Sequence, residues 1–391
     1  MKTWVFVMRI GLLILTLVAQ PIWWIGLIRE WWTSNRRIKK ERQTFGSAVY
    51  SDKYEVRHFI LLSLSLGCLL SLVTFGLGVT VPLTWLLIYL SLALIAVLIG
   101  PAAGLSTTIL IGSVVLYDLV KYFDVKFDHF GLSRSFGVNF SVVPVADLVI
   151  FVALAFIGLG IWVRFAGGRF AAPKVLSQQR GKLVAGYTFN ELLVVPTLIL
   201  VPGDWITSHL SFWPVLAMGH TTVTPLFIPL ILGLRLTIFK QQPRIAERQL
   251  ARHILVLGLI AVVLGLVTLK LNDLAVPGLL VIYLAYLGCL IWTRWRDRTR
   301  SFWFSKVDHG VRVLGIKPGT PAAKMAISVG DIITECNRQA VNSEQGFYEA
   351  LLINPTYCRL KIQTPEGDYK VTETAIFDGA PHEIGIVMFK N

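Results

Sequence analysis

Residues that could do chemistry are few in this chain, and they do not form a complete catalytic set. A zinc protease needs the pattern His-Glu-x-x-His, which places two imidazoles on one face of a helix. Of seven histidines, only His382 precedes a glutamate, and no second histidine follows at the required spacing. The four cysteines show no Cys-x-x-Cys spacing either; they are Cys68, Cys289, Cys336 and Cys358. We therefore expect no metal site and no cofactor.

Serine and aspartate proteases of the membrane are also poorly matched. An intramembrane serine nucleophile needs a Gly-x-Ser-Gly context and a histidine base, but residues 131–134 read Gly-Leu-Ser-Arg. Two facing aspartates could be Asp118, which follows a tyrosine, and Asp204. The residues before Asp204 read Val-Pro-Gly, so the first glycine of a Gly-x-Gly-Asp motif is missing. We predict no catalytic residue and no enzymatic activity, with a membrane protease or protease regulator as the alternative.

Polar residues inside apolar stretches are a further candidate for chemistry. Glu191 and His220 fall in two such stretches, and a charged group in lipid costs a few kcal/mol (~2.5–3.5) and so suggests a function. They could form a proton or ion relay in a transporter, a less favoured reading, or a structural hydrogen-bonded pair between neighbouring helices. Pro196, Pro225 and Pro229 would break both helices, which keeps a transport or lipid-binding cavity as a minor alternative.

The elements that must position these residues are mostly membrane helices. The chain has 391 residues, of which 54% are hydrophobic and 15% charged, as in multi-pass membrane proteins. A helical span needs about 20 apolar residues. We expect an all-α membrane domain of nine spans, with six to eight as the alternative. The expected spans are Arg9–Ile28, Phe59–Val79, Pro82–Ile99, Ala103–Leu119, Ala146–Val163, Leu183–Val201, Phe212–Leu234, His253–Leu269 and Pro277–Trp292.

The distribution of basic residues gives the expected orientation. With nine spans, the segments 29–58, 164–182, 235–252 and 294–306 share one side and hold 23 Lys and Arg residues, against six on the other side. Because basic loops stay in the cytoplasm, we expect the C-terminus to be cytoplasmic. Residues 302–391 carry 9 basic and 10 acidic residues. A nucleic-acid partner is therefore not expected.

One basic segment follows the first span directly. It reads RRIKKERQTF, and its basic residues are Arg36, Arg37, Lys39, Lys40 and Arg42. Trp23, Trp24, Trp31 and Trp32 precede it, and indole rings prefer the headgroup level. The segment is either a topology anchor or a surface helix that binds anionic membrane lipid or a partner protein.

Residues 302–391 form a separate module, joined to the last span by a short tether, 294–301. Alternating apolar residues and turn signals predict a small α+β, mostly β, domain. The predicted strands are Val311–Ile316, Ile332–Cys336, Tyr357–Thr364, Tyr369–Ala375 and Ile384–Phe389, and the predicted helices are Pro321–Ala326 and Ser343–Ile353.

The central part of this module resembles a PDZ domain. The resemblance rests on Gly315, Pro318, Gly319, Pro321, Gly330 and Asp331. It implies a peptide groove between one strand and one helix, in which the peptide adds to a sheet edge. The loop that receives the peptide end is similar to His382–Ile386 and comes last, so the domain looks circularly permuted. The implied groove residues are Ile384, Gly385, Ile386, Val387, Phe347 and Leu351; the alternative is that the last strand only closes the core.

The whole arrangement resembles the MinJ family of Gram-positive cell-division proteins. The order of many spans and one terminal PDZ domain carries this resemblance, together with the RIKKERQTF segment. It implies a non-enzymatic scaffold at the division septum and the poles, which bridges a DivIVA-like scaffold to MinC–MinD. The oligomeric state and the groove ligand are not indicated by the sequence. We expect a membrane domain over 1–293 and a cytoplasmic PDZ domain over 302–391.

Overall fold

The computed structural model describes residues 11, 16–100, 102–123, 144–170, 172–177, 183–203, 214–218, 221–299, 304–376 and 384–389. Its helices are α2 (Pro21–Phe45), α3 (Tyr54–Leu77), α4 (Leu83–Ile99), α5 (Ala102–Tyr122), α7 (Val145–Ala166), α8 (Pro243–Thr268), α9 (Ala275–Thr299) and α10 (Glu344–Leu352), with short 3₁₀ turns at Asn272–Leu274 and Pro321–Lys324. Its strands are β1 (Pro173–Ser177), β2 (Leu183–Pro202), β3 (Leu216–Met218), β4 (Thr221–Ile238), β5 (Val311–Arg312), β6 (Gly315–Ile316), β7 (Ile332–Cys336), β8 (Gln339–Ala340), β9 (Tyr357–Gln363), β10 (Tyr369–Ala375) and β11 (Ile386–Val387).

Apolar helices form most of the N-terminal part, as expected. Within the described residues, α3, α5, α7, α8 and the stretch from Asn272 to Thr299 are long and apolar enough to cross a membrane, and α4 is a shorter apolar helix. These helices coincide with six of the nine expected spans. In the first expected span, Arg9–Ile28, residues 9–10 and 12–15 lie outside the described part of the chain, and residues 21–28 form the start of α2. Helix α2 begins at Pro21, where the missing N–H is not needed, and it extends through the whole basic segment to Phe45.

The remaining two expected spans are not helices, so that prediction is wrong. β2 and β4 form a long antiparallel hairpin whose register pairs Tyr187 with Ile238 at one end and Pro202 with Val223 at the other. β1 and β3 extend it to a sheet of order β1-β2-β4-β3. Pro196 lies opposite Pro229 in this register. Each proline weakens a helix by about 3 kcal/mol, and the many β-branched residues around them favour strands.

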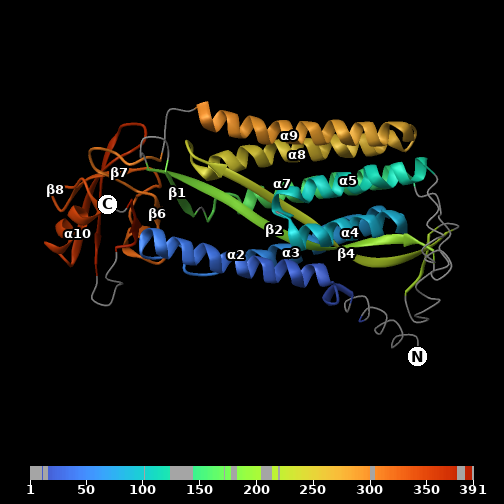
Figure 1. The fold of residues 1–391 in the computed structure, drawn as a ribbon, viewed down its shortest axis with the longest axis horizontal. Coiled ribbons are helices and arrows are strands. Elements are labelled where there is room, and N and C mark those ends of the chain that lie inside the picture. Colours follow the sequence, from blue (N-terminus) through green and yellow to red (C-terminus); the bar gives the residue numbers. More distant parts are fainter. Residues whose placement is uncertain are drawn as a thin grey trace.

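Helices surround this hairpin and supply partners for its outer edges (Figure 1). On the β2 edge, Ser71 Oγ accepts from the Leu198 N–H at 2.8 Å, and Thr74 donates to the Leu198 carbonyl. On the β4 edge, Tyr89 Oη accepts from the Ile231 N–H at 2.8 Å and donates to the Pro229 carbonyl at 3.1 Å. At these points, protein hydroxyl groups take the place that lipid cannot fill as a hydrogen-bond partner.

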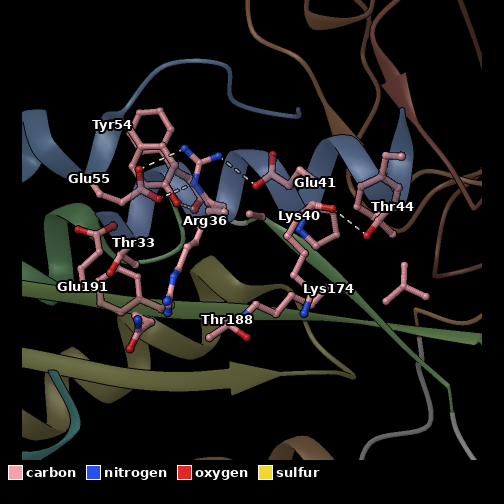
Figure 2. A pocket seen from close by; sticks show the side chains of 18 residues that line it. Thr33, Arg36, Lys40, Glu41, Thr44, Tyr54, Glu55, Lys174, Thr188 and Glu191 are labelled. Atoms are coloured by element: carbon pink, nitrogen blue, oxygen red, sulfur yellow. Dashed lines mark hydrogen bonds and ion pairs between the residues drawn. The ribbon is translucent and has the colours of Figure 1, made fainter. Parts of the chain in front are cut away.

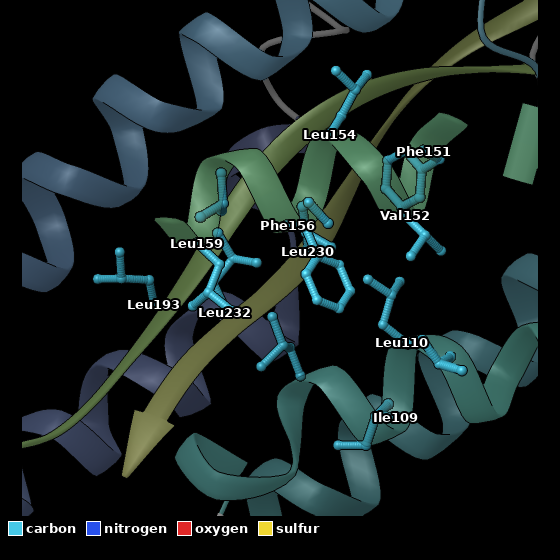
Figure 3. Packing of buried hydrophobic residues seen from close by; sticks show 14 of the residues in the cluster. Ile109, Leu110, Phe151, Val152, Leu154, Phe156, Leu159, Leu193, Leu230 and Leu232 are labelled. Carbon is cyan, nitrogen blue, oxygen red and sulfur yellow. The ribbon is translucent and has the colours of Figure 1, made fainter. Parts of the chain in front are cut away.

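The core of the membrane part lies between α7, α5 and the hairpin. Figure 3 shows Phe151 and Phe156 of α7 near Ile109 and Leu110 of α5, with Leu230 of β4 beside them. Helix α7 is the most buried of the candidate spans. Buried apolar surface contributes about 25 cal/mol per Å², so this cluster holds the helices around the strands.

The C-terminal module has a core of its own. One sheet has the order β10-β9-β7-β5, with β8 paired to β7, and a second pairs β11 with β6. Helix α10 packs Phe347 and Leu351 into the same cluster as Ile333 and Leu360. The expected hairpin of β9 and β10, the strand β7 and the helix near 343–353 are confirmed; the last strand is shorter than expected.

A second apolar cluster joins the module to the membrane part. It contains Phe45, Val49, Ala185, Tyr187, Phe304, Leu314, Val387 and Phe389. Within it, Tyr187 Oη donates to the Leu314 carbonyl at 2.8 Å, and the Ala185 N–H donates to the Phe304 carbonyl at 2.7 Å. Helix α9 continues to Thr299, so most of the stretch 294–301 expected as a tether is helical. The module is therefore packed on the membrane part rather than suspended from it.

Candidate functional site

The expected groove residues lie together, with one exception. Phe347 and Leu351 of α10 share the module's apolar cluster with Ile384 and Ile386. Val387 points the other way, into the cluster that joins the module to the membrane part. This split follows from the two-residue period of a strand, because neighbouring side chains face opposite sides. The last strand is thus held by the module on one face and by the membrane part on the other.

The backbone of this strand has one paired edge and one open edge. Ile386 lies opposite Ile316, and the Lys317 N–H donates to the Gly385 carbonyl beside this pair. That arrangement makes Ile386 and Ile316 a non-hydrogen-bonded pair, so the N–H and C=O of Ile386 point away from β6. The Leu314 N–H bonds to the Val387 carbonyl, and Met388 therefore also points its N–H to the free edge. Among the described residues, this edge has no strand beside it.

The loop before this strand is fixed by the PDZ-like motif residues. Gly385 has φ +92°, a conformation that favours glycine, and a Cβ there would collide with Thr320. The Ala322 N–H donates to the Ile384 carbonyl at 3.0 Å, just after Pro321 begins the short 3₁₀ turn. These contacts fix the position of Ile384 and Gly385, and so they fix the orientation of the backbone groups of the strand that follows. His382, at the start of the expected loop, lies outside the described residues.

The other motif residues shape the turns of the module. Gly319 and Gly330 have φ of +75° and +102°; Gly319 follows Pro318 in the turn after β6, and Gly315 begins β6 itself. Asp331 is buried, and its carboxylate accepts from the Ser328 N–H at 2.9 Å and pairs with Lys370 at 2.7 Å. These residues support the groove and do not line it.

The five basic residues of the RRIKKERQTF segment divide into three roles. Arg37 is structural: it bonds to Glu41 at 3.0 Å and to Glu55 at 2.5 Å, and both carboxylates are buried. Lys39 and Arg42 are exposed on the outer side of α2. Arg36 and Lys40 line a pocket between α2 and the strands. The segment is a helix, but only part of it is free to meet a ligand.

This pocket has a volume of about 210 Å³. Figure 2 shows side chains of α2 facing those of the strands across it, with Lys174 and Thr188 on the strand side. Burial lowers the pKa of the Lys174 ammonium, and the positive charges of Lys40 and Arg235 lower it further. Several cations therefore converge on one place, which a linear sequence does not reveal.

Glu191 has a partner that sequence reasoning missed. Its carboxylate is buried and lies 3.2 Å from Nδ1 of His58 on α3. His220, expected as a possible partner, lies outside the described residues. The pairing matches the structural reading of Glu191, but between a helix and a strand. No signal in a single sequence could connect residues 133 positions apart.

No group of three or more His, Cys, Asp or Glu residues that could hold a metal ion occurs in the described part of the chain. Asp118 is on α5, whereas Asp204 lies outside the described residues.

Comparisons with known proteins agree with both parts of this structure. Residues 301–359 match the family model for a PDZ domain, so the C-terminal module is a PDZ domain, a protein-interaction module. A solved structure similar to it is the PDZ domain of the SdrC-like protein from Listeria innocua, at 26% identity over 20% of this chain and 92% of that one, with a TM-score of 0.18.

Similarity to two curated relatives extends over nearly the whole chain. The chain is 31% identical to the cell division topological determinant MinJ of Bacillus subtilis over 95% of its own length and 92% of the relative's. It is 27% identical to the probable cell division topological determinant MinJ of Lacticaseibacillus paracasei, over 96% and 98% of the two lengths. These relatives are named as determinants of division topology and not as enzymes. At this identity and coverage, the chain belongs to the MinJ family.

Proposed function

We propose that this protein is a non-enzymatic membrane scaffold of cell division that recruits cytoplasmic proteins through its PDZ domain. In this proposal the membrane part, 1–293, anchors the molecule, and residues 302–391 carry the docking site. The partners are a DivIVA-like scaffold and MinD with its associated MinC. Their recruitment would place the division inhibitor at the septum and the poles.

One observation carries the proposal: among the described residues, no strand pairs with the second edge of the last strand, which shares its apolar cluster with α10 in a module packed on the membrane part. The N–H and C=O of Ile386 and the N–H of Met388 are directed to that edge. An extended peptide could pair with them, as in strand addition. Because Val387 and Phe389 pack against Phe45 and Tyr187, a bound partner would be held at a set orientation to the membrane.

The positions of the basic segments support a cytoplasmic PDZ domain. The hairpin begins and ends beside the module, since the Lys306 N–H bonds to the Leu183 carbonyl and the Phe304 N–H to the Phe239 carbonyl. The hairpin therefore returns the chain to the side of the membrane from which it started. Two helical spans would do the same, so the expected orientation of the later segments does not change. The described parts of the four segments that hold these basic residues lie toward the module's end of the membrane part (Figure 1), which supports that end as the cytoplasmic one by the positive-inside rule. Basic side chains there would also attract anionic membrane lipid.

A fluorescent fusion of the full-length chain tests this function in dividing cells. We expect foci at septa and poles, and long cells when the gene is deleted. Uniform membrane fluorescence together with normal cell length after deletion would contradict the scaffold role. Co-purification of DivIVA and MinD with the full-length chain then identifies which partner is bound directly.

A further inference from the structure

The pocket between α2 and the strands is built from two surfaces with regular spacing. On α2, Thr33, Arg36 and Lys40 are separated by three and four residues and therefore share one face of the helix. On the strands, Thr188 and Asn190 are two residues apart and share one face of β2. Lys174 of β1 lies opposite Gly186 in the register, which places it on this same face. Three segments of the chain thus bring polar side chains to one pocket.

Carboxylates also line the pocket, but each is already engaged. Glu41 and Glu55 both pair with Arg37. Glu191 is bound to His58 on the other side. Among the described residues, Arg36, Lys40 and Lys174 have no carboxylate within ion-pair distance. The pocket therefore contains three positive charges that lack a carboxylate counterion among the described residues.

The position of the pocket indicates where a counterion would come from. The guanidinium of Arg36 lies 3.3 Å from the ring centre of Trp32. Trp31 and Trp32 on α2 and Trp292 and Trp295 on α9 are large, exposed aromatic side chains. Exposed indoles lie at the headgroup level of a bilayer. Arg36 is one helical turn beyond Trp32 and Lys40 two turns beyond, so the pocket opens where lipid phosphates are found.

We propose that this pocket binds the phosphate group of an anionic lipid, with Arg36, Lys40 and Lys174 as its charged ligands. Arginine and lysine supply charge-assisted hydrogen bonds to phosphate oxygens, and Thr33 and Asn190 add neutral donors. Arg36, Lys40 and Lys174 are exposed, as Lys39 and Arg42 are, but the first three converge on one pocket from two segments of the chain. The site also includes Lys174, which is outside the basic segment and more than 130 residues further along the chain.

The lipid site would add a specific lipid contact to the membrane anchor of the proposed scaffold. It does not depend on partner recruitment by the PDZ domain. A soluble phosphate compound has the same binding chemistry, and the membrane location favours the lipid source. The two sources are separated by using phosphatidylglycerol and inorganic phosphate as independent probes. Recruitment of DivIVA or MinD is measured separately, so failure of one proposal leaves the other intact.

The experiment titrates detergent-solubilised full-length protein with phosphatidylglycerol and follows bound lipid by native mass spectrometry. R36Q/K40Q removes one arginine and one lysine from the pocket, and K39Q/R42Q removes the same two residue types from the outer side of α2. Basic side chains near anionic lipid each change affinity by about fivefold. We expect R36Q/K40Q to weaken binding by about thirtyfold, K174Q by about fivefold, and K39Q/R42Q by less than about twofold.

Equal thermal unfolding midpoints of the three variants and the wild type show that the fold is retained. Equal loss of lipid in the pocket and control variants would overturn the proposal, because only net charge would then matter. No loss in R36Q/K40Q and K174Q would also overturn it. If inorganic phosphate binds as tightly as phosphatidylglycerol and depends on the same residues, the lipid assignment is wrong and the site belongs to a soluble phosphate compound.

Discussion

Two pairs of strands in this chain differ in whether the backbone groups at their outer edges have hydrogen-bond partners. The hairpin of β2 and β4 lies among membrane helices, and hydroxyl groups of Ser71, Thr74 and Tyr89 bond to its edge backbone groups. The strand that begins at Ile386 has one edge paired with β6 and the other without a neighbouring strand in the described residues.

This difference follows from the surroundings of each edge. In lipid, an unpaired N–H or C=O costs several kcal/mol (~4–8), so strands are tolerated there only where protein groups cover their edges. In water an open edge costs little, but it can pair with another chain. The described contacts close the hairpin edge at these points, whereas no described strand pairs with the second edge in the PDZ domain, the edge at which we propose that partners bind. The following substitutions test the two halves of this statement.

The largest effect is expected where α3 meets β2. Gly67 packs so closely that an added Cβ would lie 2.7 Å from the Pro196 carbonyl oxygen, which is backbone and cannot move aside. Gly67→Ala should therefore separate the helix from the strand edge and destabilise the protein by ~2–3 kcal/mol. Gly76→Ala on the same helix is the control, because nothing lies within 4 Å of its Cβ position. Thermal unfolding in detergent compares the two; equal midpoints would contradict the close approach.

Loss of one buried hydroxyl should have the next largest effect. Tyr89 is fully buried and both accepts from the Ile231 N–H and donates to the Pro229 carbonyl. Tyr89→Phe leaves both groups without a partner, and we expect a loss of ~2 kcal/mol. Tyr122→Phe serves for comparison, since that side chain is 81% exposed. If both variants unfold at the wild-type temperature, the edge of β4 does not need this hydroxyl.

A smaller effect is expected on the other edge of the hairpin. Ser71→Ala removes the oxygen that accepts from the Leu198 N–H, while Thr74 still bonds to the Leu198 carbonyl. With one of the two contacts retained, the expected loss is ~1 kcal/mol. Ser91→Ala should change little, because that hydroxyl bonds only within its own exposed helical turn. A midpoint for Ser71→Ala equal to that of Ser91→Ala would show that the edge is already satisfied without the serine.

How much of the fold the sequence predicts depends on whether local patterns decide it. Six apolar helices could be placed because each stretch is long and apolar enough to be recognised alone. The hairpin could not, since an apolar run of twenty residues predicts a helix when only hydropathy is considered. Pro196, Pro225 and Pro229 were the available signal against helices, but nothing in the sequence shows that Ser71 and Tyr89 cover the strands.

The sites differ in the same way. The PDZ motif and the groove elements are local in sequence, and Phe347, Leu351, Ile384 and Ile386 do come together. Val387 faces the membrane part instead. The motif does not show that the domain packs on that part, so this orientation could not be predicted from it. The proposed phosphate pocket could not be predicted from the sequence either. It needs Lys174, and only the folded chain brings Lys174 to Arg36 and Lys40.

The smallest difference in stability between a variant and its control, and the largest difference in binding, is expected at the open edge. Met388→Pro removes the N–H that points away from β6 and has no partner among the described residues, and proline is tolerated at such a position of an edge strand. The Met388 side chain is buried, so Met388→Ala is the matched control: it loses the same packing but retains the N–H. Both variants should lose ~2–5 kcal/mol of stability, because the Met388 side chain is buried, and they should unfold within ~0.5 kcal/mol of each other. Only Met388→Pro should lose co-purification of DivIVA or MinD with the full-length chain. Equal recruitment by both variants would mean that partners do not add to this strand, and that the edge is open for some reason other than binding.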